Sequence, residues 1–228
     1  MIRFEQVSYT YPSGYEALKA LSCEINAGEY VSIVGKAGSG KTTFFMLLVG
    51  LLRISKGDLF VLDQSLKKTN DKQLSTLRRK IGTAARWLPL VNHVSALENI
   101  IQPLLISGVQ PLLAEKKGKQ LLSELELGHR YRDDVVTFSD SEYSKLLFAR
   151  AIVHDPLLIL IDDPFDQIDS PTYQLINQML EERVAQGVTV IDSSRESTTN
   201  RNLKHRTIKL MDSQITDDRE QLFFDISI

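Results

Sequence analysis

The sequence predicts an α/β protein in which parallel strands alternate with helices. A β-branched run at residues 30–35, "YVSIVG", is typical of a buried parallel strand, and a glycine-rich loop and an apolar helix follow it. A second apolar run, "LLILID" at residues 157–162, ends in a carboxylate. Residues 97–127 have a helical pattern, so β-α units flank a helical middle section.

The other elements follow from local patterns along the chain. Alternating or β-branched runs predict strands at residues 1–11, 15–26, 57–63 and 188–192. Apolar periodicity and capping residues predict helices at residues 42–52, 70–81 and 171–187. The tail, residues 217–228, fits a final strand and a frayed end equally well.

Composition narrows the classes of protein that the chain can form. A length of 228 residues suits one domain with a small inserted subdomain, and a net charge of −2 does not favour nucleic acid or anionic membranes. Cys23 is the single cysteine, which rules out an internal disulfide and fits a reducing cytosol. The start lacks the apolar core of a signal peptide, and "FFMLLVGLL" is shorter than the roughly 20 residues of a spanning helix. We therefore expect a soluble chain whose membrane role, if any, comes through a partner.

A phosphate-binding loop is the strongest motif. "GKAGSGKT" matches G-x-x-x-x-G-K-[ST], with a strand before it and a helix after it, and this context argues against a chance glycine-rich turn. The glycines let backbone N–H groups converge on phosphate, Lys41 can reach the β- and γ-phosphates, and the Thr42 hydroxyl can hold Mg²⁺. The helix starting near Lys41 directs its positive end at the anion. The predicted phosphate-binding residues are Gly35, Lys36, Ala37, Gly38, Ser39, Gly40, Lys41, Thr42 and Thr43.

Asp162 supplies the expected second half of the site. It ends the apolar run "LLILID", so its carboxylate stands at the carboxyl end of a buried strand and can hold Mg²⁺ directly or through water. Many strands end in aspartate, but the phosphate loop upstream makes the assignment specific. The sequence thus predicts a nucleoside triphosphate and Mg²⁺ as cofactors, with Thr42 and Asp162 at the metal.

With these motifs in place, the sequence resembles the ATP-binding cassette (ABC) ATPases over nearly its whole length. The layout "RRKIG…LENIIQPLLISG" is most similar to the cell-division and lipoprotein-release branch (FtsE- and LolD-like). The resemblance implies one ABC-type nucleotide-binding domain over residues 1–228. This domain has a RecA-like core, an N-terminal antiparallel β subdomain and a helical subdomain at about 84–152. It also implies a head-to-tail dimer, with each nucleotide between one subunit's phosphate loop and the other's signature loop.

The resemblance assigns roles to further residues. Tyr11, in "YTYPSG", matches the aromatic residue that stacks on adenine, although nearby Tyr9 could take that part and leave Tyr11 in the core. Asp163 takes the place of the catalytic glutamate, one methylene shorter. Arg195 takes the place of the switch histidine and keeps a donor without the acceptor nitrogen. We name Asp163 and Arg195 as degenerate replacements at the catalytic positions.

Two more positions depart from the family pattern. Arg86 stands where the family has a glutamine that contacts Mg²⁺ and the attacking water, and a guanidinium cannot ligate a metal. The signature "LSGGQ" has become "FSDSE", so Asp140 and Ser141 replace both glycines. A carboxylate there would face phosphate charge across the dimer.

These departures predict a subunit that binds Mg-ATP with weak or absent hydrolysis; the alternative is an active ATPase that powers transport through a membrane permease. A P-loop kinase is disfavoured because no acceptor site is visible, and a DNA-repair role because long inserts are lacking. The expected partners are a permease-like integral membrane subunit and a second ABC ATPase subunit or a second copy, with no nucleic acid. The expected location is cytoplasmic, at the inner face of the plasma membrane. The apolar stretch "WLPL", residues 87–90, fits partner docking and burial in the chain's own core equally well.

Overall fold

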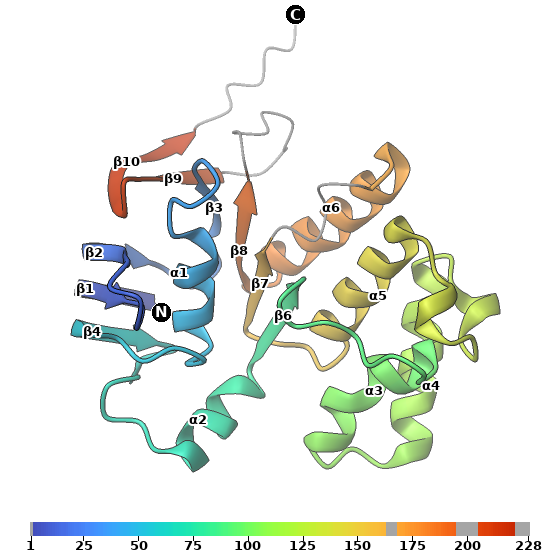
Figure 1. Ribbon diagram of the computed structural model, residues 1–228. Coiled ribbons are helices and arrows are strands. Elements are labelled where there is room, and N and C mark those ends of the chain that lie inside the picture. Colours follow the sequence, from blue (N-terminus) through green and yellow to red (C-terminus); the bar gives the residue numbers. More distant parts are fainter. Residues whose placement is uncertain (1, 163–167, 195–204, 222–228) are drawn as a thin grey trace, which may run out of the picture. The chain divides into compact units, whose positions relative to one another are not determined.

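The computed structural model describes residues 2–162, 168–194 and 205–221 (Figure 1). The chain divides into two compact units. The first unit comprises residues 1–78 and 184–228, and the second comprises residues 79–183. The predicted helical subdomain at about 84–152 falls within the second unit. Its boundaries, and the assignment of residues 1–228 to one domain, stay predictions.

An antiparallel sheet in the first unit has the strand order β2-β1-β4-β5. Its strands are β1 (Ile2–Thr10), β2 (Glu16–Ile25), β4 (Lys56–Val61) and β5 (Gln64–Ser65). Alternation in β1 buries Ile2 and Phe4 and exposes Arg3 and Glu5, as expected of a strand with one face on the core. The predicted strands at 1–11, 15–26 and 57–63 are confirmed.

A parallel group of strands in the first unit is centred on β3 (Tyr30–Val34). All of β3 is buried, because β8 (Thr189–Ser194) and β9 (His205–Met211) pair with it in parallel on either side. β10 (Gln214–Gln221) pairs antiparallel with β9 and includes the start of the tail. The predicted strand at 188–192 is confirmed.

Two helices belong to the first unit, α1 (Lys41–Leu48) and α2 (Asp71–Arg78). The ring of Phe44 on α1 stacks on Phe4 of β1, with 4.6 Å between the centroids, and fixes α1 on the sheet. α1 ends earlier than residue 52, because Gly50 takes a left-handed conformation (φ +64°) and its N–H bonds back to Leu47.

The second unit pairs β6 (Ile81–Ala85) in parallel with β7 (Leu158–Asp162) and sets Ala85 opposite Asp162. Its other elements are α3 (Ala96–Ile106), α4 (Pro111–Glu124), η1 (Gly128–Arg130), η2 (Val135–Thr137), α5 (Asp140–Ile152) and α6 (Ser170–Ala185). A Cβ on Gly82 would overlap the carbonyl oxygen of Ala151, so this glycine lets β6 approach α5. The helical pattern predicted for residues 97–127 is confirmed.

Candidate functional site

The loop of residues 35–40 joins β3 to α1 in a conformation that requires glycine. Gly38 (φ +80°) and Gly40 (φ +101°) lie in the left-handed region, which glycine enters without steric penalty. At Gly40 a Cβ would also overlap the carbonyl oxygen of Ala17. Loops of this kind present backbone N–H groups to an anion.

Lys41 begins α1, and its ammonium group folds back over the loop. Its Nζ donates to the carbonyl oxygen of Gly35 at 2.6 Å and to that of Lys36 at 3.2 Å, and the residue is 7% exposed. An ammonium group has three N–H donors. Two of them hold the lysine in the loop, and the described contacts leave the third for a phosphate oxygen.

Ser39 carries an unsatisfied hydroxyl inside the same loop. Its Oγ is buried and has no hydrogen-bond partner within the described part of the chain. Gly35 leaves the space that this hydroxyl fills, since a Cβ there would lie 2.5 Å from it. A buried polar atom without a partner is unfavourable, so a phosphate oxygen beside Ser39 would relieve it.

The N-terminus of α1 is open to an anion. Gly40 provides no side-chain cap, and no acidic residue stands in the first turn. By contrast, Ser95 caps α3 through a capping box. The free N–H groups and the positive end of α1 therefore favour negative charge. Thr42 is exposed at this end.

Two tyrosines border the phosphate loop. Tyr11 bonds through its hydroxyl to Thr43 Oγ1 at 3.0 Å, and its ring stacks on that of Tyr15 with 6.4 Å between the centroids. Tyr15 is 51% exposed and donates its hydroxyl proton to the carbonyl oxygen of Gly38 at 2.8 Å. Tyr9 is 8% exposed, and its burial and then the neighbouring Tyr11 raise its pKa. The residue packed in the core is thus Tyr9, whereas Tyr11 lies at the loop.

Sequence reasoning missed Tyr15. The signal was present in "YPSGY", where two aromatic residues bracket a proline- and glycine-containing turn. The turn closes with the Tyr11 N–H bonded to the Tyr15 carbonyl oxygen at 2.9 Å, which brings the two rings to the same end of the hairpin.

Asp162 ends β7 in a buried position, 3% exposed. Its Oδ2 accepts a hydrogen bond from Trp87 Nε1 at 2.8 Å. Its Oδ1 is buried, and none of the described residues gives it a hydrogen bond. One carboxylate oxygen is therefore fixed and the other is left for a cation. Asp163 and Arg195, the predicted replacements at the catalytic positions, lie outside the described residues.

The segment after β6, residues 86–90, has both exposed and buried residues. Arg86 is exposed, and Leu88 is 40% exposed, whereas Leu90 is 3% exposed. Arg150 of α5 donates to the carbonyl oxygens of Leu88 and Pro89 and holds the segment in place. Burial in the chain's own core thus applies to Leu90, and partner docking through the exposed residues stays a prediction.

Residues 138–142, the predicted signature segment, lead into the start of α5. Ser139 is its N-cap, and Glu142 closes a capping box with it. Asp140 and Glu142 place two carboxyl groups in the first turn, where the positive end of the helix stabilises them. The N-terminus of α5 therefore carries its own anionic groups, whereas the N-terminus of α1 carries none.

Contacts from Arg130 hold the predicted signature segment in place. Arg130 donates two N–H bonds to the Glu142 carboxylate, each at 2.9 Å, and stacks over the Phe138 ring at 4.0 Å. Burial works to raise the pKa of Glu142, but the bonds from Ser139 and Arg130 outweigh it and lower that pKa. The signature segment is thus tied to its own chain through charge-assisted bonds.

Ser141 makes a further contact that a glycine could not make. Its hydroxyl donates to Asp169 Oδ2 at 2.5 Å. This bond, and then one from the Thr172 backbone N–H, lower the pKa of Asp169 to about 2. Ser141 therefore links the start of α5 to the segment that precedes α6.

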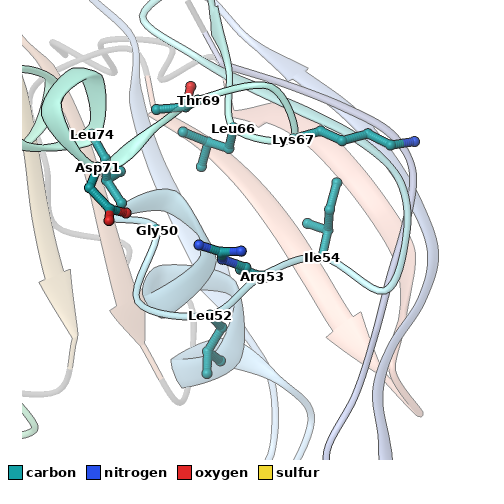
Figure 2. A pocket seen from close by; sticks show the side chains of 9 residues that line it. All are labelled: Gly50, Leu52, Arg53, Ile54, Leu66, Lys67, Thr69, Asp71 and Leu74. Carbon is teal, nitrogen blue, oxygen red and sulfur yellow. The ribbon is translucent and has the colours of Figure 1, made fainter.

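A cavity of about 170 Å³ lies past the C-terminal end of α1. In Figure 2 the Lys67 side chain points away from the others. The residues that line this cavity are Gly50, Leu52, Arg53, Ile54, Leu66, Lys67, Thr69, Asp71 and Leu74. α1 has eight residues and spans about 12 Å, so this cavity is not the phosphate loop at the other end of the helix.

Two kinds of site are absent from the described residues. They contain no cluster of three histidine, cysteine or acidic side chains placed to hold a metal ion. They also contain no helix with the length and apolar character needed to span a bilayer.

The fold and the phosphate loop define a nucleotide-binding domain of the ATP-binding cassette class. The family model described as "ABC transporter" matches residues 18–166, and the chain belongs to this family. The predicted α/β fold class is confirmed by the MJ0796 cassette, solved as a dimer in a post-hydrolysis state bound to ADP and Pi. That structure has a TM-score of 0.91 and 27% sequence identity, and the match covers 98% of this chain and 100% of the other.

Curated relatives confirm the predicted branch. The chain is 33% identical over 203 residues to the lipoprotein-releasing system ATP-binding protein LolD of Aquifex aeolicus, covering 89% of this chain and 90% of that protein. It is 29% identical over 221 residues to the cell division ATP-binding protein FtsE of Bacillus subtilis, covering 97% of each. The chain is thus an ABC-type ATP-binding subunit similar to LolD and FtsE. The divergence of its catalytic positions and the effect of that divergence on hydrolysis both stay predictions.

Proposed function

We propose that the chain is the ATP-binding subunit of a membrane-associated ABC complex and that it holds Mg-ATP with weak or absent hydrolysis. The unsatisfied Ser39 hydroxyl inside the phosphate loop carries the binding half of this proposal. The open N-terminus of α1 beside it adds a positive dipole end. Lys41 and the loop N–H groups take the phosphates, and Tyr11 stacks on the adenine.

The donor set also fits Mg²⁺. Thr42 offers an accessible hydroxyl, and Asp162 offers a carboxylate oxygen without a partner among the described residues. Hard oxygen ligands of this kind are those that Mg²⁺ prefers. The ion, when bound, neutralises charge on the β- and γ-phosphates. Thr42 belongs to the first unit and Asp162 to the second.

The low turnover in this proposal rests on four divergent places. At the first, Asp163 would act as a base that is one methylene shorter than glutamate. At the second, Arg195 would act as a donor without an acceptor nitrogen. At the third, Arg86 brings positive charge where the family has a neutral metal-contacting amide. At the fourth, Asp140 adds a carboxylate to the first turn of α5, where it would repel the γ-phosphate of an opposing subunit.

The names of the relatives support the membrane half of the proposal. One relative is an ATP-binding protein of a lipoprotein-releasing system and another a cell division ATP-binding protein, while the MJ0796 cassette was solved as a dimer. We infer a permease-like membrane partner, a dimer with a second ATPase subunit or a second copy, and a position at the inner face of the plasma membrane. The exposed Leu88 and Pro89 offer an apolar contact for that partner.

Calorimetric titration with ATP in Mg²⁺ tests binding. The wild-type chain should bind, and Lys41→Ala should lose at least tenfold in affinity because the loop loses its phosphate-facing charge. Lys72→Ala, at an exposed position on α2, is the control and should bind as the wild type does. A wild-type chain that binds no adenine nucleotide would refute the proposal.

Phosphate release tests turnover. The wild type should be slow, and the combined variant Asp163→Glu, Arg195→His, Arg86→Gln, Asp140→Gly and Ser141→Gly should be faster, since these positions act as a unit. Brisk hydrolysis by the wild type would instead support the active ATPase. No gain in the combined variant would show that the divergent positions do not limit the rate.

A further inference from the structure

The hydrogen bond between Trp87 and Asp162 follows from strand register. β6 and β7 are parallel, and Ala85, the last residue of β6, stands opposite Asp162. Neighbouring strands are about 4.8 Å apart, so a long side chain two residues beyond Ala85 can reach the carboxylate. Trp87 does so, with 2.8 Å between Nε1 and Oδ2.

The chemistry of the indole suits this place. Its N–H group is a donor only and carries no charge, so it fixes a carboxylate oxygen without competing for a cation or repelling it. Arg86, one residue earlier, is charged and exposed, and no contact of its guanidinium with Asp162 is found among the described side chains. The fixed Oδ2 leaves Oδ1 buried and unpartnered within the described structure.

We propose that Trp87 is a positioning residue for the metal-binding carboxylate: it fixes Oδ2 of Asp162 and leaves Oδ1 for the Mg²⁺ of Mg-ATP. The inference rests on the proposed function, because it needs the ion at Asp162. A residue that holds a metal ligand in this way typically changes metal affinity by about 10- to 100-fold when it is replaced. Trp87 thus supplies a neutral contact to the metal site next to the divergent Arg86.

Trp87→Phe removes the N–H donor and keeps an aromatic ring in the half-buried position. ATP affinity is measured by calorimetry in EDTA and over a series of Mg²⁺ concentrations. We expect Trp87→Phe to bind ATP in EDTA within about twofold of the wild type, and to need roughly tenfold more Mg²⁺ for half of the metal-dependent gain in affinity. The matched control is Tyr143→Phe. Its hydroxyl accepts a bond from the Leu90 N–H at 2.9 Å, so this variant loosens the same segment without touching Asp162.

A second measurement needs no variant. Trp87 is the only tryptophan in the chain, so intrinsic emission reports this site alone. Adding Mg²⁺ to the ATP-loaded wild type should change the emission, because the ion and the indole share one carboxylate. The inference alone would be overturned if Trp87→Phe needed no more Mg²⁺ than the wild type in the calorimetric series. It would also be overturned if the wild-type emission did not change with Mg²⁺. A wild type that binds no ATP in either condition would overturn the proposed function and the inference together.

Discussion

Replacing Arg130 with methionine tests how far the signature segment depends on one guanidinium. The Arg130 side chain is 20% exposed and contacts the Glu142 carboxylate, the Phe138 ring and Asp133. A partly exposed ion pair contributes about 0.2–1 kcal/mol, and a cation–π contact about 0.5–1 kcal/mol. Two pairs and one stacked ring, screened by solvent, together give about 2 kcal/mol. Methionine keeps most of the stem packing, so this figure refers to the charged contacts.

Thermal unfolding measures the loss. For a chain of 228 residues, 1 kcal/mol corresponds to roughly 2–4 °C in Tm, so Arg130→Met should lower Tm by roughly 4–8 °C. Arg132→Met is the matched control, because Arg132 is exposed and lies over the Tyr131 ring at the longer distance of 5.2 Å. Its Tm should fall by no more than roughly 2 °C. Equal losses in the two variants would refute the role assigned to Arg130.

Lowering the pH should reduce the difference in Tm between the wild type and Arg130→Met. The pKa of Glu142 is lower in the folded chain than its unfolded value of about 4.3, because the hydrogen bonds from Ser139 and Arg130 outweigh burial. A depressed carboxyl pKa contributes stability above the unfolded pKa, and that stability is lost as the pH falls through the folded pKa. The Tm gap between wild type and Arg130→Met should therefore narrow below about pH 4. A gap that does not change between pH 7 and pH 3 would show that the ion pair is not its source.

Three further variants test contacts elsewhere. Gly82→Ala should destabilise the chain by about 1–3 kcal/mol in denaturant unfolding, because its Cβ would overlap a backbone carbonyl oxygen of α5; an unchanged midpoint would contradict this close approach. Tyr15→Phe should weaken ATP binding by roughly two- to tenfold in calorimetry, since the phosphate loop loses the bond to the Gly38 carbonyl oxygen. Ser141→Ala should raise the pKa of Asp169 from about 2 in an NMR titration, and an unmoved pKa would show that the serine hydroxyl is not its main cause.

Local signals made much of the fold predictable. The phosphate loop, the buried run of β3 and the helical middle section all follow from short windows of sequence, because turn chemistry and hydrophobic periodicity act within a few residues. The shape of the loop also follows, since the left-handed positions are at Gly38 and Gly40. The C-terminal end of α1 was harder to predict, because the helix ends before Gly50 although its apolar pattern continues past this residue.

Contacts set by register could not be read from the sequence. Trp87 and Asp162 are 75 positions apart and meet only because β6 and β7 pair in one register. The strand β8 gives a similar case, since the sequence pattern there indicates an apolar strand. Asp192 is nevertheless buried in it, with the Ser32 hydroxyl of β3 opposite as a donor. A buried carboxylate needs such a partner, and only the pairing of the strands reveals it.

The N-termini of α1 and α5 differ in how their positive ends are satisfied, and this difference supports the proposed subunit that binds nucleotide with weak or absent hydrolysis. α1 begins with glycine and no acidic residue, so a phosphate from outside the chain is its natural partner. α5 begins with its own capping box and with Asp140 in the first turn, so its positive end is already satisfied within the chain. Dipole and charge thus favour phosphate at α1 and oppose it at α5. We therefore expect "FSDSE" to attract a second subunit's nucleotide less than the chain's own phosphate loop attracts phosphate.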